Sequence, residues 1–303
     1  MKKITNKGVA VILSLALAFS LPIVSYADAA GEVTEAITAD DKTYLALGAD
    51  LTEEQKNTVL SLLGVKAEEL KDYDVLYVTN TDEKNYLSSY ISKEVIGTKA
   101  LSSVVVAKRD SGHGILVSTK NITYCTTGMY RNALVTAGIT DADVIVAGPF
   151  PITGTAALVG AMKAYSGITG EDISEDAMDT AVDELVTTGK LGDSLGDSEQ
   201  AVQLIAYIKQ LVIENHLDTD EGIRKAINDA EKEMEVTLSD EEKDEILNLM
   251  RKVNDLDLNI DSLKEQAKQI YDKLEEMDLK NSSLWDKITN FFSSIFSKLA
   301  SLF

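Results

Sequence analysis

The chain has 303 residues, 45% of them hydrophobic and 26% charged. This composition supports a buried core in one or two domains and argues against a disordered chain or a multi-span membrane protein. The 50 acidic and 29 basic residues give a net charge of −21, which argues against nucleic acid as a partner. With one cysteine and two histidines, we expect no internal disulfide, no metal and no cofactor.

Residues 1–29 have the pattern of a secretory signal peptide. Three lysines precede an apolar run over residues 8–24, and small residues at cleavage spacing predict removal after Ala27 or Ala29. The alternative is an uncleaved anchor, although the run is short for a full membrane span. We therefore expect a secreted or extracellular protein associated with the cell envelope.

Residues 30–169 alternate between helix and strand patterns, which predicts an α/β domain. Thr52 and Gln55 form a capping-box pattern that starts a helix, and Gly64 is a natural stop. Further helices are expected from about residues 80, 126 and 153. The predicted strands cover residues 74–79, 102–107, 115–118 and 143–147.

The connections between these strands predict a small mixed sheet. A helix between the first two strands should make them parallel. The Gly-rich segment 108–114 indicates a hairpin between the second and third strands. A helical crossover should then place the fourth strand parallel to the third.

Two regions of different composition follow the α/β domain. Residues 170–280 contain 31 acidic and 12 basic residues, lack proline and show helical patterns throughout, with N-caps expected at Ser174, Ser198, Ser239 and Asp261. Residues 281–303 predict a one-sided amphipathic helix rich in aromatic residues.

The apolar side of this last helix needs a surface to cover it. We expect a membrane surface, a wall polymer or a protein partner, or else docking on the protein's own helices. The contact residues would be Trp285, Ile288, Phe291, Phe292, Ile295, Phe296 and Leu299.

The candidate ligand site lies where the last two strands each lead into a helix. Free N–H groups and threonine hydroxyls at two helix N-termini are suited to a phosphate, a carboxylate or a sugar acid. The alternative is ordinary N-capping. The residues of this candidate site are Thr126, Thr127, Gly128, Thr153, Gly154 and Thr155.

The predicted topology also places a weaker polar cluster at the opposite rim of the sheet, formed by Asn80, Thr81, Asp82, Arg109 and His113. Cys125 lies at a helix start, which favours a reactive thiolate. His113 and Cys125 should nevertheless lie at opposite rims, separated by the length of the third strand, so we do not expect a Cys–His dyad.

Several segments together resemble a known family. These are TYLALGADLTEEQKNTVLSLLGV, VLYVTNTDEKNYL and ALVTAGITDADVIVAGPFPITGTAALVGAMKAY. They are similar to the YpuA-like exported proteins of sporulating and related Gram-positive bacteria, domain-of-unknown-function family 1002. The resemblance covers about residues 40–280. It implies an exported envelope protein and supplies no catalytic residues, and the aromatic tail lies outside it.

We therefore predict an α/β fold with a small mixed sheet, followed by an all-α region and a C-terminal amphipathic helix. The expected function is binding or interaction at the cell envelope without an evident catalytic site. One alternative is a cell-wall-directed hydrolase that uses a carboxylate pair. Another is a structural, self-assembling envelope protein.

Overall fold

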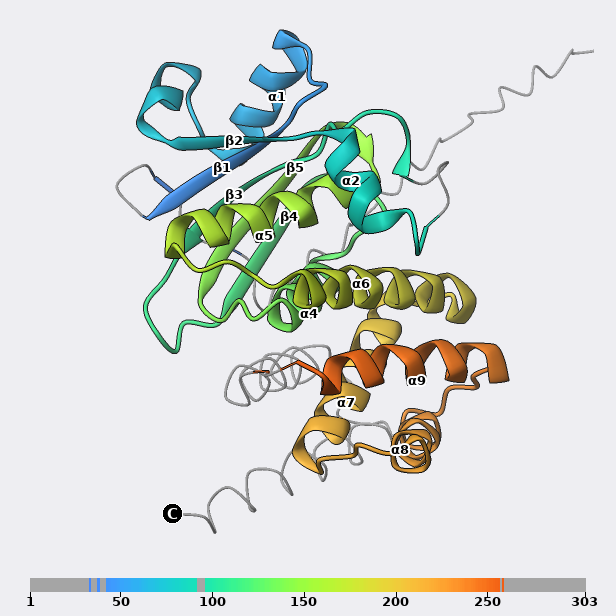
Figure 1. Cartoon of the computed structure of the whole chain (residues 1–303). Coiled ribbons are helices and arrows are strands. Elements are labelled where there is room, and N and C mark those ends of the chain that lie inside the picture. Colours follow the sequence, from blue (N-terminus) through green and yellow to red (C-terminus); the bar gives the residue numbers. More distant parts are fainter. Residues whose placement is uncertain (1–32, 34–36, 39–41, 92–95, 257, 259–303) are drawn as a thin grey trace, which may run out of the picture.

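A computed structural model describes residues 33, 37–38, 42–91, 96–256 and 258 (Figure 1). The predicted signal peptide, the N-cap at Asp261 and the amphipathic tail lie outside these residues. No helix among the described residues is long and apolar enough to span a membrane.

A five-stranded mixed sheet lies at the centre of the α/β part, in the order β2-β1-β3-β5-β4. The pairs β1/β2 and β4/β5 are parallel, whereas β3 runs antiparallel to both of its neighbours. The predicted mixed sheet is therefore confirmed. Its strands are β1 (Thr43–Gly48), β2 (Asp74–Val78), β3 (Ser103–Lys108), β4 (Ile115–Ile122) and β5 (Ala142–Ile152).

The sheet differs from the sequence prediction in three respects. Strand β1 was not predicted. It lies between β2 and β3, so these two strands are neither adjacent nor parallel. The predicted β3–β4 hairpin is also wrong, because β5 lies between these strands and pairs with both. The parallel pairing of β4 with β5 is confirmed.

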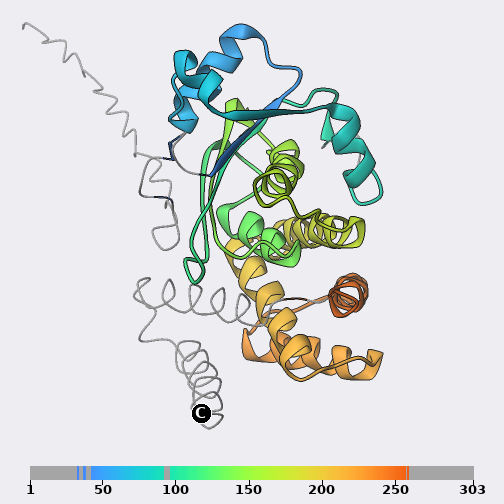
Figure 2. The same ribbon diagram turned by 60° about the vertical axis from the view of Figure 1, so that its left-hand side comes forward.

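Both faces of the sheet are covered, as its central strand shows. On β3, Val104 and Val106 belong to one hydrophobic cluster, while Val105 and Ala107 belong to a second cluster on the other face. This is the pattern of a strand that is buried on both sides. Helices α4 (Thr127–Thr136) and α5 (Thr155–Thr169) cover the first face, and α1 (Glu53–Leu63) packs on the second (Figure 2).

Two short helices flank strand β2. They are the 3-10 helix η1 (Ala67–Asp72), just before it, and α2 (Asn80–Leu87), just after it. Helix α2 packs against α5 and α6 and therefore lies on the same face of the sheet as α5.

Side-chain caps fix the helix starts much as the sequence indicates. Thr52 and Gln55 form the expected capping box of α1, and Gly64 ends that helix with a φ of 79°. The cap expected at Ser198 is displaced by one residue, because Asp197 accepts the backbone N–H groups of the first turn of α7. An aspartate is an equally good cap, so local pattern alone does not separate the two positions.

The helical part consists of α6 (Glu175–Leu195), α7 (Ser198–Glu214), α8 (Asp220–Glu233) and α9 (Asp240–Asn254), and lies below the sheet in Figure 1. Helices α7, α8 and α9 share a core of their own. Most buried apolar side chains of α6 instead belong to the cluster on the α4/α5 face of the sheet, while Leu191 near its end belongs to the helical core. The parts of the chain before and after residue 170 therefore pack together, although their compositions differ.

Candidate functional site

The carboxyl ends of β1, β2, β4 and β5 meet at one edge of the sheet, where ligands bind in many open α/β folds. The two predicted helix starts come together there. The backbone N–H of Thr123 donates to the carbonyl of Ile152 at 2.8 Å, and that of Cys125 donates to the carbonyl of Thr153 at 3.1 Å. The predicted proximity of these two strand ends is therefore confirmed.

Most of the predicted groups at this edge make internal contacts. Thr126 caps α4 by accepting the N–H of Met129 at 3.2 Å. Gly128 lies so close to α7 that a Cβ there would be 2.7 Å from Val202 Cγ1. Gly154 has a φ of 98°, and its carbonyl accepts the Tyr130 hydroxyl at 2.5 Å. The contacts are those of helix starts and packing, and an anion-binding role stays a prediction.

Glu83 on α2 was not singled out by the sequence, and its side chain contacts Thr155 at the start of α5. Its side chain is buried, and its two oxygens accept hydrogen bonds from Thr155 Oγ1 at 2.9 Å and from Asn80 Nδ2 at 3.3 Å. Burial raises the pKa of Glu83 to about 7, against the opposing effect of these two hydrogen bonds. The chain thus places one of its own carboxyl groups where the sequence predicted an external anion.

No sequence signal separates Glu83 from its neighbours. Acidic residues are common in the first turn of any helix, since they interact favourably with its N-terminus. Burial against α5 and the tertiary contact with Thr155 distinguish this carboxyl group from the exposed ones.

The weaker polar cluster is not a single site. Because β2 runs parallel to β4 and β5, Asn80, Thr81 and Asp82 lie at the carboxyl edge, where Asp82 pairs with Lys163. Arg109 and His113 lie at the opposite edge, in the β3–β4 connection. The predicted grouping of the five residues is therefore wrong, and the cause is the misplaced β2.

At that opposite edge, Arg109 and His113 share one buried carboxylate. Arg109 Nε lies 2.6 Å from Asp143 Oδ2, and His113 Nε2 lies 2.8 Å from Asp143 Oδ1. Cys125 follows the far end of β4 and is fully buried, which raises the pKa of its thiol to about 12. The expected separation of His113 from Cys125 is confirmed, and the thiol is poorly suited to act as a nucleophile.

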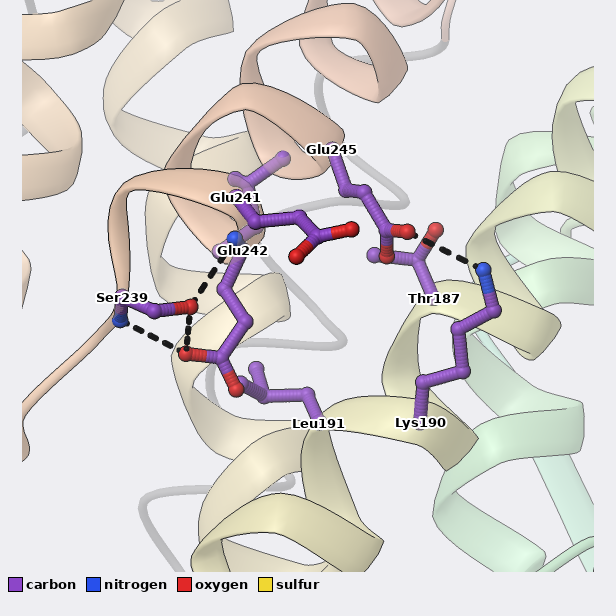
Figure 3. Close-up of a pocket in the computed structure, with 8 residues that line it drawn as sticks. Thr187, Lys190, Leu191, Ser239, Glu241, Glu242 and Glu245 are labelled. Atoms are coloured by element: carbon purple, nitrogen blue, oxygen red, sulfur yellow. Dashed lines mark hydrogen bonds and ion pairs between the residues drawn. The ribbon is translucent and has the colours of Figure 1, made fainter.

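A second candidate site is a pocket of about 250 Å³ between α6 and the start of α9 (Figure 3). Its walls combine carboxylates, hydroxyls, one lysine and an apolar part. The lining residues are Thr187, Lys190, Leu191, Ser239, Glu241, Glu242, Glu245 and Ile246.

Two internal pairs order this pocket (Figure 3). Ser239 and Glu242 form the capping box of α9, with the Ser239 hydroxyl donating to Glu242 Oε2 at 2.7 Å. Lys190 Nζ lies 3.1 Å from Glu245 Oε1. Between them, the Glu241 carboxylate points into the open space, and no interaction is drawn to it. Burial acts to raise the pKa of Glu242, but hydrogen bonds from Ser194 and Ser239 lower it overall.

A metal site is not formed by these carboxylates. Throughout the part of the chain that the structure describes, no three His, Cys, Asp or Glu side chains are grouped so that they could hold a metal ion.

Comparison with known proteins places the sequence in a family. Residues 47–270 match the model of DUF1002, a family described as proteins of unknown function. The chain belongs to this family. It is also 38% identical to the uncharacterized protein YpuA of Bacillus subtilis (strain 168), over 100% of both chains. No solved structure shows a significant match to this DUF1002 protein.

Proposed function

We propose that this DUF1002 protein is an exported, non-catalytic binding protein of the cell envelope, and that its pocket between α6 and α9 receives a positively charged group of the ligand. The observation that carries this proposal is the composition of the pocket walls. Three glutamates face a single lysine, which is itself paired with Glu245.

The chemistry of the walls favours an alkylammonium group. An ammonium has three N–H donors and no acceptor, which matches the Glu241 carboxylate and the hydroxyls of Thr187 and Ser239. Leu191 and Ile246 provide an apolar surface for the alkyl chain. The net charge of −21 would also attract cationic ligands from solution. Amino groups of wall peptides have this chemistry.

Hydrolysis by a carboxylate pair has less support in this pocket. A general acid of this kind needs a carboxyl group with a raised pKa. The pKa of Glu242 is lowered, while the raised pKa near neutrality belongs to Glu83, which is buried and does not line the pocket. The location outside the cytoplasm rests on the predicted signal peptide over residues 1–29.

Calorimetric titration of residues 28–303 with 1,5-diaminopentane tests the proposed pocket. We expect saturable binding at low salt and none with the di-N-acetylated compound, which has no charge. Glu241→Gln should weaken binding about tenfold, since one charge-assisted hydrogen bond is lost. Glu221→Gln, an exposed change in the first turn of α8, is the matched control and should leave binding unchanged. Equal affinity of Glu241→Gln and wild type would contradict the proposed pocket.

We also propose that the predicted amphipathic helix over residues 281–303 attaches the protein to a membrane surface. Its sequence carries large apolar residues at helical spacing and two lysines. Residues 28–303 should co-sediment with phosphatidylglycerol vesicles, and the pair Phe291→Asp and Phe292→Asp should abolish this. The matched pair Ser293→Asp and Ser294→Asp, on the polar side, should reduce it much less. An equal loss of co-sedimentation in both pairs would mean that the added negative charge, and not the apolar side, determines vesicle binding.

A further inference from the structure

Arg131 on α4 is a buried cation whose hydrogen bonds are incomplete. Arg131 is 3% exposed, and its Nε and Nη2 atoms are fully buried without a hydrogen-bond partner among the described residues. Buried N–H groups of a guanidinium are costly to leave unpaired, and in folded proteins such groups are explained by strain, by a functional role, or by a bound water or ion.

The two unpaired atoms form one edge of the guanidinium. Nε–H and Nη2–H point in the same direction and together match the two oxygens of a carboxylate or a phosphate. The same protein shows this edge in use. Arg251 Nε donates to Asp220 Oδ1 at 2.8 Å, and Arg251 Nη2 donates to the other oxygen of the same carboxylate. Arg131 presents the same pair of donors, and the described part of the chain supplies no acceptor for them.

The surroundings of Arg131 favour an anion. Side chains on a helix lean towards its N-terminus, so Arg131 extends over the first turn of α4, which begins at Thr127. Helix α7 also presents its first turn here, because Glu199 is the acidic group that acts on Arg131 and Gly128 packs on Val202. The N-terminal ends of both helices add positive potential to that of the guanidinium, and the Asp197 and Glu199 carboxylates at the start of α7 offset part of it.

We infer that Arg131 is the anchor of an oxyanion-binding site between the first turns of α4 and α7, with a carboxylate or a phosphate group as its ligand. Glu199 is partly exposed in the first turn of α7, and its side chain would turn towards solvent as the anion enters. This site lies one turn inside the helix whose start, at Thr126, Thr127 and Gly128, the sequence marked for anion binding. It does not depend on the pocket between α6 and α9.

The test is titration of residues 28–303 with inorganic phosphate and, separately, with acetate, in bis-Tris chloride at constant ionic strength. The readouts are calorimetry and the NMR shift of the Arg131 Nε–H. We expect saturable binding of at least one anion together with a downfield shift of this proton. Arg131→Lys keeps the charge but loses the paired donors, and should weaken binding at least tenfold. Arg251→Lys, whose donors already hold Asp220, is the matched control and should bind as wild type does.

Three outcomes would overturn the inference. The first is the absence of saturable binding of both anions. The second is an equal response in Arg131→Lys and wild type. The third is an Nε–H that is hydrogen-bonded to Glu199 or to another group of the chain without added anion, since the donor would then be occupied by the protein itself. If Arg131→Lys does not fold, the Nε–H titration of the wild-type protein decides alone.

Discussion

At the scale of single residues, Glu83 shows how tertiary contacts change the behaviour of an ordinary helix residue. It is 2% exposed and accepts hydrogen bonds from Thr155 and Asn80, which hold it between the starts of α2 and α5. Burial raises the pKa of this carboxyl group to about 7, from 4.5 in its ordinary environment. The folded protein therefore retains a proton that the unfolded chain has already released.

This difference sets the direction of a pH effect on stability. Between about pH 4.5 and pH 7 the folded state binds more protons at Glu83 than the unfolded state does, so the free energy of unfolding falls as the pH rises. Glu83→Gln should remove this contribution, so that the decrease in the free energy of unfolding between pH 5 and pH 8 becomes smaller by about 2–3 kcal/mol. Urea unfolding at pH 5 and at pH 8 measures this decrease. Glu54→Gln, an exposed change on α1, is the control. An unchanged loss in Glu83→Gln would contradict the assignment.

Local residue pattern predicted the caps but not the buried charges. Thr52, Thr126 and Ser239 are N-caps because a hydroxyl three residues before a free N–H is a local relation, visible in the sequence. Glu83 and Arg131 lie in helices next to other polar residues, so no local pattern distinguishes them. Their importance depends on Thr155 and on α7, which are distant in the chain, so sequence reading did not identify them.

At the scale of elements, a buried ion pair joins three helices. Lys209 on α7 is fully buried, and its ammonium donates to Glu184 Oε1 on α6 at 2.8 Å. Its other two donors reach Thr136 Oγ1 at 2.9 Å and the carbonyl of Asn132 at 3.1 Å, both on α4. All three donors of the ammonium are thus used, which is the condition for burying a lysine.

Removing one partner of this pair should cost much more than removing both charges. Lys209→Met leaves Glu184 buried without its cation, and should lower the free energy of unfolding by about 3–5 kcal/mol. Adding Glu184→Gln should recover about half of that loss, because Thr136 can still donate to the neutral amide. A double-mutant cycle by urea unfolding measures the coupling. Purely additive losses would show that the pair contributes no specific interaction.

The strand pairing was the least predictable feature of the fold at this scale. Each strand from β2 to β5 has a recognisable local pattern, but nothing local indicates that β5 inserts between β3 and β4. The missed β1 pairs with both β2 and β3, and this omission produced the wrong position for Asn80 and Asp82. The edge where α4 and α5 begin was predictable, because a helical crossover between β4 and β5 makes these strands parallel and brings their carboxyl ends to one edge.

At the scale of the whole molecule, the sheet and the helical part are connected by shared packing. Val202 on α7 belongs to the cluster on the α4/α5 face of the sheet, although most apolar residues of α7 belong to the helical cluster. Ile213 and Leu258 contact both clusters. Together with Lys209, these contacts link the acidic helices to the sheet, so we expect the described part of the chain to unfold as one cooperative unit.

A substitution in the core far from the sheet tests this cooperativity. Ile227 on α8 is fully buried in the helical cluster, and Ile227→Ala should lower the free energy of unfolding by about 2–5 kcal/mol. In a single unit, the slowest-exchanging amides of β3 should lose the same opening free energy as those of α7. Val105→Ala, in the sheet, is the reciprocal change and should lower protection in α8. If the amides of β3 keep their protection in Ile227→Ala, the helices unfold separately, and the domain boundary follows the composition change near residue 170.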